Sequence, residues 1–144
     1  MEEKKVIDVV DDDFLELIEL SREKYNELKI SYPKLYSILI GADSVFLFKP
    51  ISVKDQMDIE KKLHAREKEL TQGLGLSEED LEVNEELIGD LTRYASILYC
   101  EKGCVWPEAF DFNSEEILPG IVSNLSYRIQ EFSGLSDQGL IKKV

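Results

Sequence analysis

The chain has 144 residues, of which 43% are hydrophobic, and this is enough to form a hydrophobic core and argues against a wholly disordered chain. Thirty acidic side chains against seventeen basic ones give a net charge of -13, which disfavours binding to nucleic acid or to an anionic membrane. No apolar run reaches the roughly 18 residues of a membrane span, and no signal-peptide core follows the charged first residues. We therefore expect a protein that acts in the cytoplasm of the cell that makes it.

The first 30 residues predict an arm followed by a helix. Residues 1–10 begin with charge and continue with β-branched side chains, which predicts a flexible or extended arm. Three aspartates at 11–13 can cap a helix and place negative charge at its positive end. Apolar residues then recur at helical spacing, which predicts a helix over about 12–30. Pro33 is expected to separate it from the next element, because proline disfavours helical geometry in the residue before it.

The segment 34–51 carries the β-type signal. Its first part, 34–40, fits either a short helical turn or a strand. Ser44–Ile51 is rich in aromatic and β-branched side chains and predicts a strand, which Pro50 should end or place at a sheet edge. A single short strand is not stable alone. Its candidate partners are residues 34–40, 6–10 and 104–106.

Two helices follow, each introduced by a capping-box pattern. The first begins at Ser52 and should run to about Leu70, and the glycines in 71–76 predict a loop after it. Its few apolar residues predict one narrow buried stripe, formed by Val53, Met57, Ile59, Leu63 and Leu70. The second pattern begins at Ser77 and predicts the main core helix over about 78–101. A break near Val83–Asn84 stays open, and Gly103 should end this helix.

An aromatic loop and a well-delimited helix complete the pattern. The loop over Val105–Asn113 contains Trp106 and two phenylalanines. Pro119 suits the first position of a helix, and Gly134 suits the position just after its end. The expected inner face of this helix is Ile121, Val122, Leu125, Ile129 and Phe132. Residues 135–144 carry no pattern and are expected to form a tail.

These elements predict a mainly α fold. We expect a small helical domain of four to five helices with one short β-hairpin or edge strand near 34–51. This single domain should span 11–134, between the arm at 1–10 and the tail at 135–144.

No constellation of residues indicates catalysis. Cys100 and Cys104 would share one face of a helix, but two thiols are too few for a structural zinc site. His64, the single histidine, lies in a charged helical pattern that predicts a surface position. The clustered carboxylates stand where helix starts favour them, and Gly73 and Gly75 lack the third glycine of a dinucleotide motif. We expect a protein without enzymatic activity, metal or cofactor.

The aromatic loop has two interpretations. It could anchor a protein interface, where tryptophan and other aromatic residues are enriched, or it could cover the ends of two core helices. If a partner binds, the candidate contact residues are Trp106, Phe110 and Phe112, with Tyr94 and Tyr127.

Three motifs in the chain resemble those of tail and baseplate assembly chaperones of tailed bacteriophages. They are V-F-L-F-K-P-I at 45–51, V-W-P-E at 105–108 and L-P-G-I-V-S-N-L-S-Y-R-I-Q-E-F-S-G at 118–134. The resemblance covers about 45–134, and the inserted E-K-G-C at 101–104 departs from it. It implies a small helical phage protein without a cofactor that binds other tail or baseplate proteins, such as tape-measure or hub proteins. It further implies a location in the host cytoplasm or in the virion.

The leading hypothesis is therefore a non-enzymatic protein-binding factor in bacteriophage tail or baseplate assembly. Its amphipathic helices and aromatic loop would hold an apolar or helical segment of a partner, in the helix-in-groove manner. One alternative is a structural subunit of the assembled virion tail or baseplate. Another is an acidic host-directed inhibitor, in which the seven carboxylates at 78–90 imitate nucleic acid.

Overall fold

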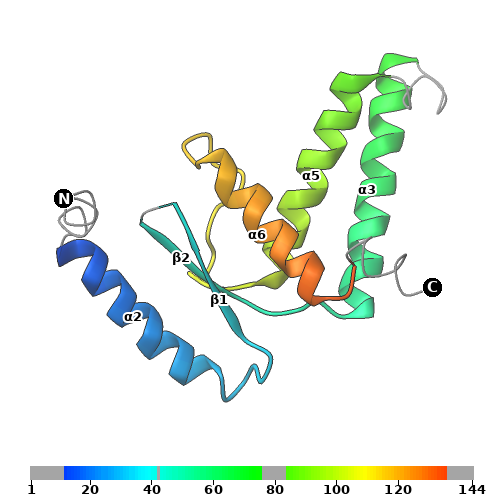
Figure 1. The fold of residues 1–144 in the computed structure, drawn as a ribbon. Coiled ribbons are helices and arrows are strands. Elements are labelled where there is room, and N and C mark those ends of the chain that lie inside the picture. The colour runs from blue at the N-terminus through cyan, green and yellow to red at the C-terminus, as the bar shows by residue number, and fades with distance from the viewer. Residues whose placement is uncertain (1–11, 42, 76–83, 136–144) are drawn as a thin grey trace, which may run out of the picture. The chain divides into compact units, whose positions relative to one another are not determined.

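The computed structural model of the chain describes residues 12–41, 43–75 and 84–135. The described residues form four helices and a small antiparallel sheet (Figure 1), which confirms the mainly α fold with a short hairpin. The elements are α2 (Asp12–Leu28), β1 (Tyr36–Ile40), β2 (Ser44–Phe48), α3 (Val53–Leu74), α5 (Glu85–Gly103), β3 (Cys104–Trp106) and α6 (Pro119–Phe132).

The described residues divide into two compact units. The sheet unit contains the residues up to Lys49 together with Cys104–Phe110. The helical unit contains Pro50–Gly103 and the residues from Asp111 onward. The expected arm at 1–10 lies outside the described residues, as does the expected tail apart from Leu135. A single domain over 11–134 stays a prediction.

In the sheet unit, α2 packs against β2, the central strand of a sheet with the order β1-β2-β3. The helix ends at Leu28, close to the predicted boundary, and the carbonyl of Leu28 accepts the N–H of Tyr32. Both predicted strand partners at 34–40 and 104–106 are confirmed, while residues 6–10 lie outside the described part.

The hairpin of β1 and β2 has a regular register, from Tyr36 opposite Phe48 to Ile40 opposite Ser44. β2 is buried from Val45 to Phe48, which explains its nearly continuous run of large apolar side chains. The strand ends at Phe48, two residues before Pro50, as the loss of a backbone N–H at proline predicts.

α3 opens with the predicted capping box. The hydroxyl Oγ of Ser52 accepts the N–H of Asp55 at 3.1 Å, and the Asp55 carboxylate accepts the N–H of Ser52 at 3.3 Å. The predicted end at Leu70 is wrong, because helix α3 runs to Leu74 and includes most of the expected loop at 71–76. Only Gly75 adopts the left-handed geometry (φ 68°) that ends the helix, and glycine tolerates it at little cost.

α5 begins at Glu85, where the side chain of Asn84 accepts the N–H of Leu87 at 3.1 Å. The expected capping box at Ser77 and the start of the predicted helix at 78 lie outside the described residues. The helix ends at Gly103 as predicted, and its side chains Ile97, Leu98 and Cys100 are buried.

α6 begins at Pro119 and is followed by Gly134 at φ 78°, and both predictions are confirmed. The predicted inner face is confirmed at Ile121, Val122, Leu125 and Ile129, which are all buried. It is wrong at Phe132, which is 44% exposed. The next two residues leave the helix, so Phe132 sits at its last turn, where fewer neighbours can cover a side chain.

Within the helical unit, α5 lies between α3 and α6 and packs against both (Figure 1). Ile59 of α3 packs with Leu98 and Tyr99 of α5 to form a buried cluster. Half-buried residues close this cluster at its edges: Ile51, Leu63, Tyr94 and Leu135. The cluster thereby supports the end of α6, because Leu135 directly follows that helix.

Candidate functional site

Two of the five aromatic residues expected to bind a partner pack inside the sheet unit. Trp106 is half-buried in β3, opposite Leu47 of β2. The ring of Phe110 meets the ring of Phe46 edge-on, with their centroids 5.1 Å apart. Such edge-to-face packing stabilises the sheet unit. Both residues therefore lie beside β2, whereas one interpretation of the loop placed its aromatic rings over the ends of two core helices.

The other three belong to the helical unit, and only one of them is exposed. Phe112 is 2% exposed and therefore unavailable to a partner in this conformation. Tyr94 is half-buried beneath the guanidinium of Arg66, which lies 5.3 Å from the ring centroid. Tyr127 is 50% exposed on α6 and is the one member of the predicted set with a large free surface.

The apolar side chains that stand most exposed on α3 are Val53 and Met57, at 78% and 63%. Their predicted place in a buried stripe is wrong. Met57 and Ile59 are two residues apart and so point about 200° apart around the helix, which means that they cannot share one face. Ile59 is buried, and the exposed pair instead forms a second apolar face at the start of α3.

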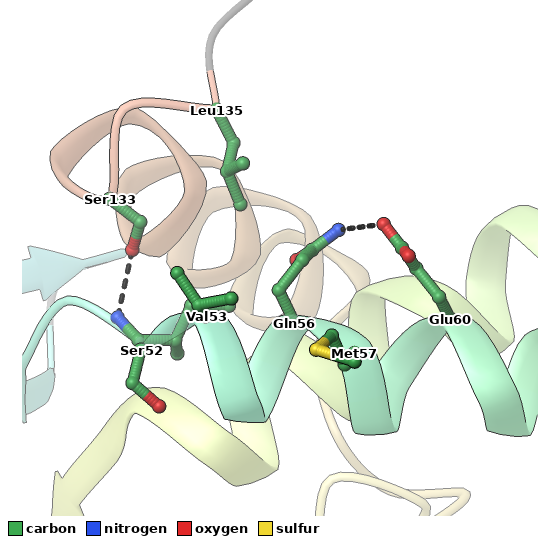
Figure 2. Close-up of a pocket in the computed structure, with 8 residues that line it drawn as sticks. Ser52, Val53, Gln56, Met57, Glu60, Ser133 and Leu135 are labelled. Atoms are coloured by element: carbon green, nitrogen blue, oxygen red, sulfur yellow. Dashed lines mark hydrogen bonds between the residues drawn. The ribbon is translucent and has the colours of Figure 1, made fainter.

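This exposed face borders a groove of about 280 Å³ (Figure 2). The groove lies between the start of α3 and the end of α6. Its lining residues are Ile51, Ser52, Val53, Gln56, Met57, Glu60, Ser133 and Leu135. We refer to it below as the α3–α6 groove.

A single hydroxyl joins the two sides of the α3–α6 groove. Ser133 Oγ accepts the backbone N–H of Ile51 at 2.9 Å and donates to the carbonyl of Ile129 at 2.6 Å (Figure 2). The bond spans 82 residues of sequence and satisfies a backbone donor just before the α3 cap. Ser133 thus links the end of α6 to the residue that precedes the α3 cap.

The end of α6 shapes the other wall through its backbone. Gly134 donates its N–H to the carbonyl of Glu131, and Leu135 donates to the carbonyl of Gln130, which is the Schellman arrangement. The left-handed residue Gly134 turns the chain back, and this turn directs Leu135 onto the buried cluster. Leu135 and Ile51 therefore provide part of the apolar lining of the groove.

The remaining wall is polar and carries one carboxylate. Gln56 donates from Nε2 to the Glu60 carboxylate at 3.0 Å, and its Oε1 accepts the Tyr99 hydroxyl at 2.9 Å. Both ends of the Gln56 amide are therefore used, and this fixes the side chain in one orientation. Since the partner of Glu60 in this bond is a neutral amide, the negative charge of Glu60 is not balanced there.

The neighbouring acids of α3 are balanced by lysines. Lys102 Nζ lies 2.8 Å from the Asp58 carboxylate and 4.0 Å from that of Asp55. Hydrogen bonds from Lys102 and then Lys62 lower the pKa of Asp58, and the bond to Asp58 raises the pKa of Lys102. Among the acids of this first part of α3, Glu60 is thus the one that offers charge to the groove.

The two cysteines lie in different elements and in different chemical settings. Cys100 is fully buried in α5, and its Sγ donates to the Val122 carbonyl at 3.4 Å. Cys104 begins β3, so the two do not share a helix face as the spacing suggested. Burial raises the pKa of the Cys104 thiol to about 12, which keeps it protonated at neutral pH.

We expect both thiols of the native chain to react with an aromatic disulfide reagent at pH 8 at least about tenfold more slowly than free cysteine. The thiolate is the reacting species. The raised pKa of Cys104 reduces its thiolate population, and full burial of Cys100 denies the reagent access. The measurement is the absorbance of the released thiol over time. The same chain in urea should release two equivalents quickly. Rapid release of one equivalent from the folded chain would contradict the assignment for Cys104.

The part of the chain that the structure describes shows no sign of a metal site or of a membrane-spanning helix. Residues 12–41, 43–75 and 84–135 hold no group of three or more His, Cys, Asp or Glu side chains that could bind a metal ion. His64 is exposed on α3, as predicted. Within the same residues, no helix is long and apolar enough to cross a membrane.

No family model matches the chain, and no curated protein or solved structure is significantly similar to it. Its function must therefore be argued from its own residues and their geometry.

The sequence could not point to the α3–α6 groove as a site, because the groove depends on a contact between residues 51 and 133. One local signal was present nonetheless. Val53 and Met57 are four residues apart, and Ile59 with Leu63 form a second pair at the same spacing. The two apolar pairs are offset by six residues, or about 240° around the helix, and so predict two faces, of which only one can point to a common core.

Proposed function

We propose that the chain is a non-enzymatic protein-binding factor in bacteriophage tail or baseplate assembly, and that the α3–α6 groove holds an apolar segment of another tail protein. One observation carries the proposal. The residues that resemble phage assembly chaperones are also residues that build the groove. The motif at 45–51 ends in Ile51, and the motif at 118–134 ends in Ser133-Gly134. These two motif ends are joined by the Ile51–Ser133 hydrogen bond.

The chemistry of the groove supports one kind of occupant. Apolar surface from Met57, Val53 and Leu135 would lose contact with water when a partner's apolar side chain enters. The carboxylate of Glu60 at the polar wall favours a basic side chain beside that apolar residue. We therefore propose a partner segment, helical or extended, that carries an apolar anchor next to a lysine or arginine.

We expect a double variant, Val53→Thr with Met57→Gln, to bind its partner at least about tenfold more weakly, because both changes keep the side-chain size but remove apolar contact. Both residues are exposed, so folding should be unaffected. The measurement is a pull-down of co-expressed tail and baseplate proteins, followed by titration of the captured partner.

Leu74→Gln is the matched control, because Leu74 lies on the same helix and is 60% exposed, close to the 63% of Met57. This control should bind the partner as the original chain does. If no tail or baseplate protein is captured, or if the double variant captures it equally well, the proposal is wrong.

A permanent subunit of the tail or baseplate would use the same groove in a lasting interface. Mass spectrometry of purified particles separates the two roles. An assembly factor that leaves should be absent from mature particles, whereas a subunit should be present in fixed stoichiometry.

A further inference from the structure

Within the described residues of the sheet unit, one strand edge lacks the protection found on the other edge. The strand order β1-β2-β3 makes β1 and β3 the two edge strands. The β3 edge is three residues long, its register with β2 is irregular, and Pro107 directly follows it. Shortness, irregular register and proline are all devices that keep an edge from pairing with another strand.

β1 has none of these devices. Its five residues, Y-S-I-L-I, include no charge and no proline, and each of them pairs one-to-one with β2. Ser37 is exposed, and Leu39 is 51% exposed. A regular, uncharged edge strand with exposed apolar surface is a template for a further strand, because the outer backbone N–H and C=O groups of an edge point away from the sheet.

We propose that β1 pairs antiparallel with β1 of a second copy of this chain, so that two three-stranded sheets join into one across a two-fold axis at Ile38. In this register Ser37 lies opposite Leu39 of the other copy. The two copies use the same five residues, as a two-fold interface requires. Because β1 is uncharged, the strand itself adds no local repulsion when two chains of net charge -13 approach through it.

The charges that flank β1 favour the antiparallel arrangement of a second copy. Lys34 precedes the strand and Asp43 follows it in the hairpin turn, and both are exposed. An antiparallel copy brings Lys34 beside the turn that carries Asp43 of the other copy, once at each end of the interface. A parallel copy would instead bring Lys34 beside Lys34, and like charges repel. The sheet edge and its flanking charges thus specify the same occupant.

The first test is the oligomeric state of the full chain over a range of concentrations, measured by sedimentation equilibrium. We expect reversible dimerisation with a dissociation constant of roughly 1 to 100 μM, which suits a small and transient interface. Leu39→Lys should weaken the dimer at least about tenfold, since an exposed lysine on an edge strand opposes pairing. Leu15→Lys is the matched control, because Leu15 in α2 of the same unit has the same 51% exposure.

A charge swap separates pairing from an effect on folding. Lys34→Asp and Asp43→Lys should each weaken the dimer, because each change creates two like-charge contacts. The double variant should restore it, since opposite charges again face one another. Loss of folding in a single variant would not be repaired in this way.

A cysteine at the axis tests the register directly. Residues on the axis face each other with their Cα atoms about 4.5 to 5.5 Å apart, which is within reach of a disulfide. Ile38→Cys should therefore form a covalent dimer with oxidised glutathione, whereas Leu15→Cys should not. A chain that stays monomeric, a dimer that Leu39→Lys leaves intact, or the absence of the Ile38→Cys crosslink would overturn the proposal. None of these residues lines the α3–α6 groove, so the outcome is independent of partner binding.

Discussion

Ile59→Ala is expected to lower the free energy of unfolding of the helical unit by about 2 to 5 kcal/mol, because it opens a cavity at the centre of a buried cluster. Ile59 of α3 is fully buried where this helix packs against α5, in contact with Leu98 and Tyr99. The half-buried Ile51 and Leu135, which line the α3–α6 groove, pack against the same cluster. The variant should therefore also weaken partner binding, because Ile51 and Leu135 would be held less firmly in the lining of the groove.

Urea denaturation followed by far-ultraviolet circular dichroism measures the stability change. Val53→Ala provides the control, because it truncates another β-branched side chain of α3, one that is 78% exposed. Its cost should stay within about 0.5 kcal/mol, as for most surface changes. Equal losses in the two variants would contradict the assignment of Ile59 to the core and of Val53 to the surface.

Helix ends were the most predictable feature of the fold, because their signals are local. The Ser52–Asp55 capping box, Pro119 at a first helical position and Gly134 after a last one each act through bonds within a few residues. The extension of α3 to Leu74 is the exception. A glycine such as Gly73 weakens a helix without ending it, and only left-handed geometry at Gly75 ends this one.

Burial was less predictable, since it depends on neighbours far away in sequence. Val53 and Ile59 are both apolar and β-branched, yet one is exposed and the other buried, because only one face of α3 meets α5. Phe112 carries an aromatic ring typical of interfaces but is buried in the chain itself. Chemical type alone therefore does not decide which aromatic side chains stay available to a partner, and the α3–α6 groove depends on a contact between Ile51 and Ser133, which are 82 residues apart.

Gly103→Ala should lower the free energy of unfolding by about 1 to 3 kcal/mol, because it forces an extra carbon into a filled site. A Cβ at Gly103 would lie 2.6 Å from Cδ1 of Ile129 and 2.8 Å from both Cγ1 and Cγ2. Ile129 is fully buried in α6 and has little room to retreat. Glycine at the end of α5 thus sets how closely α5 and α6 approach each other.

Gly89→Ala in the same helix distinguishes this crowding from a general effect of glycine. A Cβ at Gly89 meets nothing within 4 Å, so alanine there should stabilise α5 by about 0.5 to 1 kcal/mol through its better helix propensity. The two glycine-to-alanine changes should therefore have opposite signs in urea denaturation. Adding Ile129→Val, which removes the nearest carbon, should recover part of the loss at Gly103. The same sign at both positions, or no recovery by Ile129→Val, would mean that crowding between α5 and α6 does not explain why glycine stands at 103.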